Sequence, residues 1–477
     1  MSERRVIQVE EKVPFLKALP LSIQHLFAMF GASVLVPFLF NNYAQTHFVE
    51  KVLKTTWEAA KADPTILEKV NQVQVIDPAL VLLLNGIGTL IYLLLCKGKA
   101  PAFLGSSFAF LSPTASVITS VAVENNFDTS SYTDKFATAL GGFIMCGLVF
   151  VIVALIIGKV GTRWLDVVLP PAAMGPIVAL IGLELSANAA SMAKLFPDAN
   201  GVFDTKGIII SLVTLAIAIF GTLIFRGFLS VIPILIAVLA GYGLSAWMGY
   251  LDVSMVKAAE WFALPTVTMP KFEINAIIII IPAALVVLSE HIGHLFVTSN
   301  IVGKDLTKDP GLHRSLLGDG ISTMLSGFTG SCPTTTYGEN MGVMAITRVY
   351  SVWVIGGAGV ISIIIAFFGK LSGIIKSIPE PVMGGISILL FGTIAASGIR
   401  MIVEAKIDYS KSKNLILTAV VFVVGISNVS VNLGNDVQLK GMVLATLVGM
   451  ALSLIFYVLE KLKLTNEPAE EKETAKV

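Results

Sequence analysis

The chain alternates long, uncharged apolar runs with short polar segments. A helix needs roughly 20 apolar residues to cross the hydrocarbon core of a membrane. Ten runs free of Asp, Glu, Lys and Arg come close to or exceed that length: 18–49, 78–96, 100–123, 136–158, 207–225, 227–251, 349–369, 381–399, 414–435 and 441–459. The first has no signal-peptide cleavage site and is expected to stay as a span.

Three further apolar regions are shorter or interrupted, at 167–183, 274–289 and 312–346. Dividing the last at its glycine-rich turn gives fourteen membrane-spanning segments. With both termini in the cytoplasm, this layout places every arginine on the cytoplasmic side, as the positive-inside rule requires. These arginines are Arg4, Arg5, Arg163, Arg226, Arg314, Arg348 and Arg400.

Composition agrees with a protein embedded in lipid. Hydrophobic residues make up 55% of the 477 residues and charged residues 14%, and the mean hydropathy is +0.83. The net charge of +1 gives no reason to expect a nucleic-acid partner. We therefore predict an all-α polytopic membrane protein surrounded by membrane lipid.

A short internal repeat indicates how the spans are related. The segment LPPAAMGPIVAL from Leu169 matches IPEPVMGGISIL from Ile378 at an offset of 209 residues. These segments are the fifth and twelfth spans, and a displacement of seven spans reverses the direction of crossing. The pattern predicts a 7+7 inverted repeat, an arrangement common among transporters.

Two segments, 101–110 and 330–338, mix Gly, Pro and hydroxyl residues with aromatic or β-branched ones. This composition favours extended backbone, which is tolerated at membrane depth only where protein or a water-filled cavity satisfies it. Half-helices are expected to start near Ser112 and Glu339, with their N-termini directed at one mid-membrane site. Re-entrant turns without a ligand are the alternative interpretation.

The titratable residues of VVLSEHIGHLFV, at 286–297, extend an apolar run that begins at Ile274. Glu290 and His294 are four residues apart and share one helix face, with His291 beside them. A charge at the bilayer centre costs about 2.5–3.5 kcal/mol, so such residues usually mark a substrate or ion path. A carboxylate beside an imidazole can also hold a coupling proton.

Three other polar groups lie in apolar segments: Gln24–His25, Ser106–Ser107–Phe108 and Glu339–Asn340. Together with Glu290 and His294 they suit a small, flat ligand that carries N–H donors and carbonyl acceptors. Helix bracing is an equally good interpretation of His25. The order E-H-x-x-H differs from the zinc motif H-E-x-x-H, so we expect no metal, no cofactor and no enzyme activity. Cys96, Cys146 and Cys332 show no disulfide or metal spacing.

At these motifs the chain resembles a known family. Its signature, N-x-G-x-x-x-x-T preceded by Gln, Glu or Pro and followed by Arg, Lys or Gly, fits 339–348, ENMGVMAITR. QHLFAMFGASVLVP, PAFLGSSFAFLSP and SEHIGH agree as well. The chain thus resembles the nucleobase/ascorbate transporters, a nucleobase:cation symporter family, and Glu339 in place of glutamine resembles its uracil branch. The polar segment 41–78, with its helix-like KVLKTTWEAAK, is longer than the resemblance leads us to expect.

The resemblance implies a proton symporter for uracil in the bacterial inner membrane, working by alternating access as a homodimer. It also implies short strands in segments 3 and 10. The implied division is a cytoplasmic N-terminus at 1–19, a core domain at 20–158 (segments 1–4) and 252–369 (segments 8–11), a gate domain at 159–251 (segments 5–7) and 370–459 (segments 12–14), and a cytoplasmic tail at 460–477.

The resemblance also assigns roles. Glu290 and Glu339 would bind the pyrimidine, with Phe108, Gly338, Ala32 and one serine, which we take as Ser107, completing the pocket. His294 would couple proton binding to substrate binding together with Glu290, and His25 would support the site. A xanthine or other purine cargo, or ascorbate, is one alternative; an anion transporter of the same fold is another. A metal-dependent membrane enzyme is a third.

Overall fold

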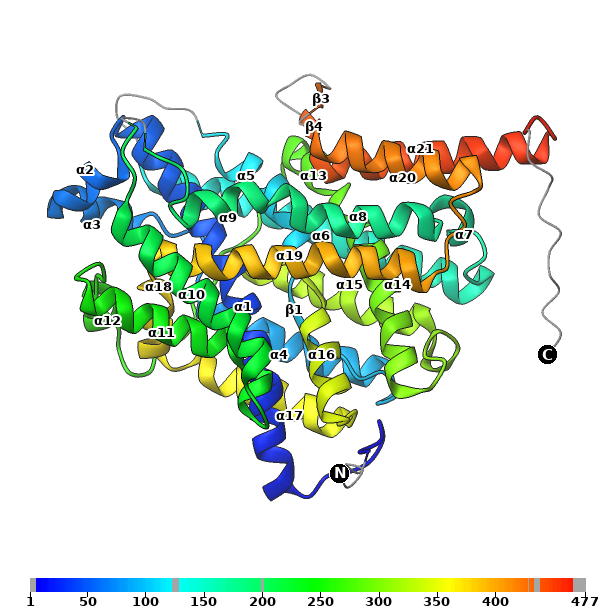
Figure 1. Cartoon of the computed structure of the whole chain (residues 1–477), viewed down its shortest axis with the longest axis horizontal. Coiled ribbons are helices and arrows are strands. Elements are labelled where there is room, and N and C mark those ends of the chain that lie inside the picture. Colours follow the sequence, from blue (N-terminus) through cyan, green and yellow to red (C-terminus); the bar gives the residue numbers. More distant parts are fainter. Residues whose placement is uncertain (1–5, 122–127, 199–200, 428, 433–437, 466–477) are drawn as a thin grey trace.

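The computed structural model describes residues 6–121, 128–198, 201–427, 429–432 and 438–465 (Figure 1). Within these residues, eight helices are long and apolar enough to cross a membrane. Four shorter apolar helices accompany them: Phe108–Ile118, Pro233–Trp247, Val352–Ala366 and Ser412–Ile426. The predicted helical membrane protein is confirmed at this level.

The helices pack as two groups. The first helix group is held together chiefly by α15 against α4 and α6, and by α17 against α1 and α4. Its members are α1 (Phe15–His47), α4 (Pro78–Leu95), α5 (Leu111–Ile118), α6 (Ser130–Val160), α13 (Ile274–Ile280), α14 (Ala283–Val302), α15 (Leu312–Thr329), α16 (Gly338–Thr347) and α17 (Val352–Ala366).

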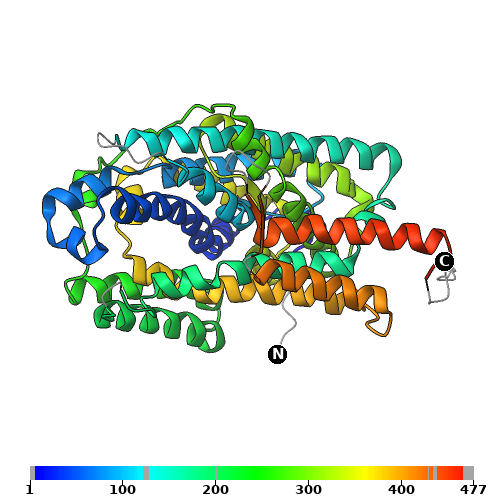
Figure 2. The same ribbon diagram turned by 90° about the horizontal axis from the view of Figure 1, so that it is seen from above.

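The second helix group is built around α19, which packs on α8, α9, α10 and α11. In Figure 2, α6 of the first group lies along one edge of the molecule and α20 along the opposite edge. The members of the second group are α8 (Pro171–Glu184), α9 (Ser186–Met192), α10 (Thr205–Ile224), α11 (Pro233–Trp247), α19 (Glu380–Glu404), α20 (Ser412–Ile426) and α21 (Gly441–Lys461).

Short elements connect these helices. They are η1 (Phe48–Val52), α2 (Trp57–Ala62), α3 (Pro64–Gln72), η2 (Phe108–Phe110), α7 (Leu165–Val168), η3 (Leu229–Val231), α12 (Ser254–Ala258), η4 (Thr307–Gly311), α18 (Gly369–Lys376), β3 (Ser430–Asn432) and β4 (Gln438–Lys440). The helix-like stretch 51–61 is divided in the structure, with η1 ending at Val52 and α2 beginning at Trp57. Thr56 accepts a hydrogen bond from Ala59 N at 3.3 Å and caps α2, so that helix begins only at Trp57.

Some boundaries differ from the predicted ones. Helix α1 begins at Phe15, inside the expected N-terminal segment 1–19, and α21 ends at Lys461. Residues 466–477 of the expected tail lie outside the described residues, as does part of the run 414–435. The run from Ile274 divides into α13 and α14 at Pro282, which cannot donate the hydrogen bond that a continuous helix needs.

Two short strands lie in the segments where extended backbone was expected. Strand β1 (Leu104–Ser106) pairs antiparallel with β2 (Thr334–Thr336), with Gly105 opposite Thr335. Both strands are fully buried. Helices α5 and α16 follow them, so the predicted strand and half-helix pairs are confirmed. The pairing joins parts of the chain more than 200 residues apart.

The two copies of the sequence repeat form helices that pack on each other. Helix α8 begins after Pro170 and α19 begins after Pro379, at equivalent positions of the repeat. Gly175 of α8 lies against Gly398, and Gly182 lies against the Phe391 carbonyl, where any β-carbon would collide. The later residue of α8 therefore contacts the earlier residue of α19, so the two helices are antiparallel.

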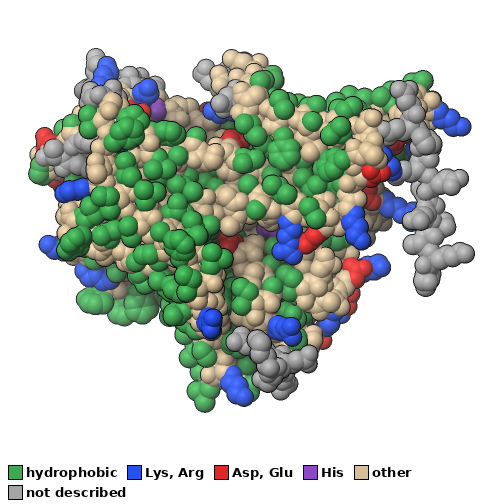
Figure 3. Space-filling view, viewed as in Figure 1, with side chains coloured by type: hydrophobic (Ala, Val, Ile, Leu, Met, Phe, Trp, Pro, Cys, Tyr) green, Lys and Arg blue, Asp and Glu red, His purple; other side chains and the backbone are tan. Residues whose placement is uncertain are grey.

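Apolar side chains are spread over the whole face seen in Figure 3, while Lys and Arg side chains lie mostly toward its margins and in its lower right part. Helix α10 contributes several of the exposed apolar side chains, among them Leu212, Phe220 and Leu223. Soluble proteins do not expose apolar surface on this scale. The protein is an integral membrane protein.

Candidate functional site

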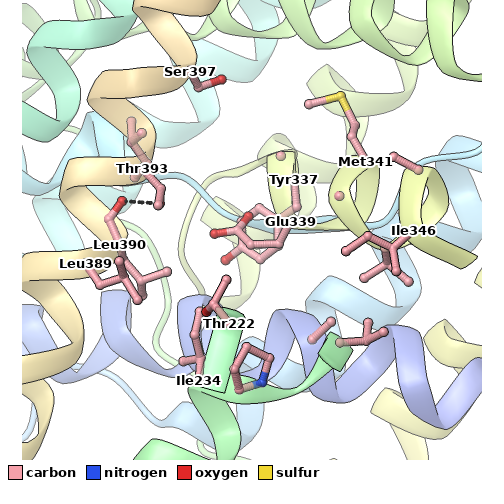
Figure 4. Close-up of a pocket in the computed structure, with 18 of the residues that line it drawn as sticks. Thr222, Ile234, Tyr337, Glu339, Met341, Ile346, Leu389, Leu390, Thr393 and Ser397 are labelled. Carbon is pink, nitrogen blue, oxygen red and sulfur yellow. Dashed lines mark hydrogen bonds between the residues drawn. The ribbon is translucent and has the colours of Figure 1, made fainter. Parts of the chain in front are cut away.

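A cavity of about 570 Å³ lies between the two helix groups. This volume falls within the usual range for small-molecule sites. The first group supplies residues of α1, η2, α14, β2 and α16, and the second supplies residues of α8, α10, α11 and α19. In Figure 4, Glu339 occupies the centre of the view, with Leu390 and Thr393 of α19 on one side and Ile346 on the other.

Glu339 and Gly338 open helix α16 directly after strand β2. Tyr337 precedes the helix with extended dihedral angles, and its side chain accepts no hydrogen bond from the first turn. As in any α-helix, the first N–H groups of α16 have no intrahelical partner. Gly338 and Glu339 both line the cavity. The site therefore combines a carboxylate with the backbone N–H groups of a helix N-terminus, which suits a ligand that has both N–H and carbonyl groups.

Glu290 and His294 line the same cavity from helix α14. Glu290 Oε2 has no hydrogen-bond partner within the described residues. His294 Nδ1 lies 2.7 Å from the Thr336 carbonyl, and since a carbonyl only accepts, Nδ1–H donates there. The other ring nitrogen, Nε2, lies next to Gly338, 3.7 Å from where a β-carbon would stand. Nε2 is thus left to exchange a proton or bind a ligand.

Phe108 lines the cavity from η2, and its ring meets Phe391 of α19 edge-on at a centroid distance of 5.8 Å. Ser107 is fully buried behind it and is not among the lining residues; its N–H donates to the Pro333 carbonyl at 2.9 Å. Ala32 is also buried away from the cavity, and Ala28, one turn earlier on α1, lines it instead. The geometry therefore gives Ser107 and Ala32 no direct place at the cavity surface.

His25 also lies outside the cavity lining and braces α1 against α16. Its Nδ1 is 2.9 Å from Asn340 Oδ1. Asn340 is the asparagine of the family signature, and Thr347, at the far end of that signature, donates to the Val343 carbonyl at 2.7 Å. Arg348 then ends the helix in the left-handed conformation. Helix bracing is thus the role of His25 that the contacts support.

The sequence interpretation missed Tyr337, whose ring lies over Gly105 of strand β1. The Tyr337 hydroxyl donates to the Ser106 carbonyl at 3.2 Å. A β-carbon on Gly105 would collide with the ring. The glycine in LGSSF was the only available signal, because a glycine inside a strand often marks a close approach.

Replacing Gly105 by alanine should therefore displace Tyr337 and destabilise the fold by about 1–3 kcal/mol, as overpacking does. The thermal unfolding temperature of the purified protein would measure the effect. Gly342→Ala on α16 is a matched control, because a β-carbon there meets no atom within 4 Å. An unfolding temperature for Gly105→Ala equal to that of the control would contradict this packing.

Helix α19 contributes a polar stripe that was also missed. Thr393, Ser397 and Arg400 recur at helical spacing and all line the cavity. Arg400 Nε donates to Glu404 Oε1 at 2.6 Å. This spacing is visible in the sequence, but the sequence does not indicate which helices this face of α19 lies against.

Residues 63–434 match the model of the Permease family. The chain belongs to this family. Among its relatives, the "Uracil permease" of Paenibacillus larvae subsp. larvae is 53% identical over 466 residues, covering 97% of this chain and 99% of the relative. That of Escherichia coli K12 is 53% identical over 460 residues, covering 96% of each chain. That of Bacillus subtilis is 42% identical, covering 91% of each. The expected family is confirmed, and its named members are permeases rather than enzymes.

Solved structures agree on the fold. The transmembrane domain of the cyanobacterial bicarbonate transporter BicA aligns with a TM-score of 0.55 at 15% identity, covering 94% of this chain and 100% of that domain. The murine anion transporter Slc26a9 in the inward-facing state aligns with a TM-score of 0.63 at 10% identity, covering 94% of this chain and 69% of that one. At such identities the likeness concerns the fold alone.

Proposed function

We propose that this permease imports uracil together with protons across the bacterial inner membrane. The observation that carries the proposal is that Glu290 and Glu339 line one cavity together with His294, between two groups of helices. Uracil offers two N–H donors flanked by carbonyl acceptors, which matches carboxylates beside the backbone N–H groups at the N-terminus of α16. The names of the relatives, several of them uracil permeases, support this cargo.

In the proposed complex, the two glutamates accept the N–H groups of uracil. The backbone of Phe108 and Gly338 serves its carbonyl oxygens, and the Phe108 ring, held against Phe391, provides an apolar wall. His294 takes up the coupling proton at Nε2, since Nδ1 is engaged with Thr336. The two carboxylates repel each other when both are ionised, so each proton that binds in the cavity lowers this repulsion.

Alternating access follows if the first helix group moves against the second as core against gate. Each group packs more closely within itself than against the other, and the substrate cavity lies at their boundary. The first seven segments would then be α1, α4, β1 with α5, α6, α8, α10 and α11. The second seven would be α13 with α14, α15, β2 with α16, α17, α19, α20 and α21, each crossing the membrane in the opposite direction to its counterpart. The antiparallel pairing of β1 with β2 supports the inverted relation.

Both termini are proposed to be cytoplasmic, with the permease a homodimer that associates through its gate domain. The exposed apolar side chains of α10, which belongs to the proposed gate domain, are suited to packing against a second subunit in the membrane. Fully active monomers reconstituted in liposomes would remove the dimer from the proposal.

Two alternative cargoes remain within the same fold. A purine would share the N–H and carbonyl pattern, so only competition distinguishes it. An anion is disfavoured, because Glu290 and Glu339 face the cavity and would repel it, while Arg400, the cation in the lining, is paired with Glu404. The anion-transporting neighbours share the fold at 15% identity or less.

The deciding experiment is uptake of labelled uracil into proteoliposomes with and without an acid-outside pH gradient. We expect the gradient to stimulate uptake, excess unlabelled uracil to block it and excess xanthine to leave it unchanged. Uptake that ignores the gradient would reduce the protein to a facilitator. Absence of uracil uptake would reject the cargo.

A further inference from the structure

A second pair of titratable side chains lies behind the cavity, inside the first helix group. His291 Nδ1 is 2.9 Å from Asp319 Oδ2, and both side chains are completely buried. Neither residue lines the 570 Å³ cavity. The carboxylate can only accept when ionised, so Nδ1–H of His291 donates to it.

A chain of hydroxyl groups continues from the other side of the imidazole ring. His291 Nε2 is 2.8 Å from Ser315 Oγ, which is 2.8 Å from the Tyr92 hydroxyl. Either oxygen of that last contact can donate. Protonation at Nε2 can therefore be accommodated by turning the Ser315 hydroxyl toward Tyr92, without moving any heavy atom.

The charges around the pair favour the uptake of one proton. With neutral His291, the pair carries one negative charge in a membrane-buried site, which is costly. One added proton gives imidazolium beside carboxylate and cancels it. The titratable groups that interact with the pair are His294 and Glu290 on α14 and Tyr92 on α4, and beyond Tyr92 lie Cys96 on α4 and Arg314 on α15. Of these groups only Arg314 carries a permanent positive charge, and its Nη1 donates to the Leu95 carbonyl at 3.5 Å.

Two connections lead from the pair to the substrate cavity. Asp319 Oδ1 accepts from Thr334 Oγ1 at 3.2 Å, in the strand whose Thr336 carbonyl holds His294. A separate cavity of about 10 Å³, roughly the room needed by one water molecule, is lined by His291, Ser315 and Tyr92 and also by His294. The first connection links Asp319 to His294 through strand β2. The second links His291 to His294 through the space for one water molecule.

We propose that His291 and Asp319 form a proton-holding site of the transport cycle, separate from the substrate cavity and connected to His294. A proton that arrives at His294 passes through the 10 Å³ cavity and the Ser315 hydroxyl to His291 Nε2, which leaves His294 neutral again. The loaded pair releases the proton by the reverse path after the cavity opens to the cytoplasm. This inference rests on the proposed proton coupling.

Asp319→Asn provides the main test, since it removes the charge with little change in shape. We expect uracil binding, measured by isothermal titration in detergent, to change less than about threefold. Exchange of external labelled for internal unlabelled uracil, which needs no net proton movement, should persist. Stimulation of uptake by an acid-outside gradient should be lost. Loss of binding along with transport would instead give the pair a purely structural role at β2 and overturn the proposal.

Ser315→Ala provides a second test that leaves both titratable groups in place and cuts only the hydroxyl chain. We expect gradient-stimulated uptake to fall several-fold while exchange continues. Ser326→Ala is the matched control, because Ser326 is equally buried on α15 and its hydroxyl has no partner within the described residues. Normal gradient stimulation in both Asp319→Asn and Ser315→Ala would overturn the proposal. If the unaltered protein itself ignored the gradient, the proposed symport would fail first.

Discussion

Glu339→Gln is expected to weaken uracil binding by about 100-fold or more while the protein stays folded. Glu339 stands in the first turn of α16 and lines the cavity (Figure 4), where its carboxylate can accept an N–H of uracil. A glutamine amide must be turned to offer its single oxygen, and the charge that strengthens the hydrogen bond is lost. A hydrogen bond to a charged group contributes about 1.5–3 kcal/mol, and about 2.8 kcal/mol corresponds to 100-fold in affinity.

Titration calorimetry on the purified variant would measure this loss. Glu273→Gln is a suitable control, since Glu273 lies on the surface beside Lys135 at 3.7 Å and away from the cavity. We expect the control to bind uracil with unchanged affinity. If Glu339→Gln retained full affinity, Glu339 would have to be removed from the substrate contacts, and Glu290 alone would carry the N–H recognition.

His294→Ala is expected to abolish the stimulation of uracil uptake by an acid-outside gradient, with binding weakened only about tenfold. His294 lines the cavity and is fixed by its Nδ1 contact with Thr336, so its free Nε2 is the group best placed to take a proton between the cavity and the interior. The methyl group of alanine cannot bind a proton. The affinity falls because the ring also forms part of the cavity wall.

Uptake at a series of external pH values, with and without a gradient, would reveal the change. His313→Ala is the control, because His313 stands on α15 outside the cavity lining and should keep the pH response of the unaltered protein. A gradient-dependent His294→Ala variant would place proton uptake elsewhere, with Glu290 the next group to examine.

Local chemistry was enough to predict much of this structure. The uncharged runs located the apolar helices, and the Gly, Pro and hydroxyl pattern of 101–110 and 330–338 located β1, β2 and the two half-helices. Helical spacing put Glu290 and His294 on one face of α14, where they line the cavity together. These features depend on residues close in sequence, and the cost of burying a polar group in lipid leaves few other arrangements.

The tertiary structure alone decided which distant residues meet. Nothing in the sequence indicated that Thr393 and Arg400 of α19 would line the same cavity as Glu339, or that His291 would pair with Asp319 rather than join His294 at the cavity. The same holds for His25, which packs against Asn340, and for Ala28 in place of Ala32. A helix shows its periodicity in sequence, but the neighbour that each face meets depends on the packing of all the helices at once, which local patterns do not encode.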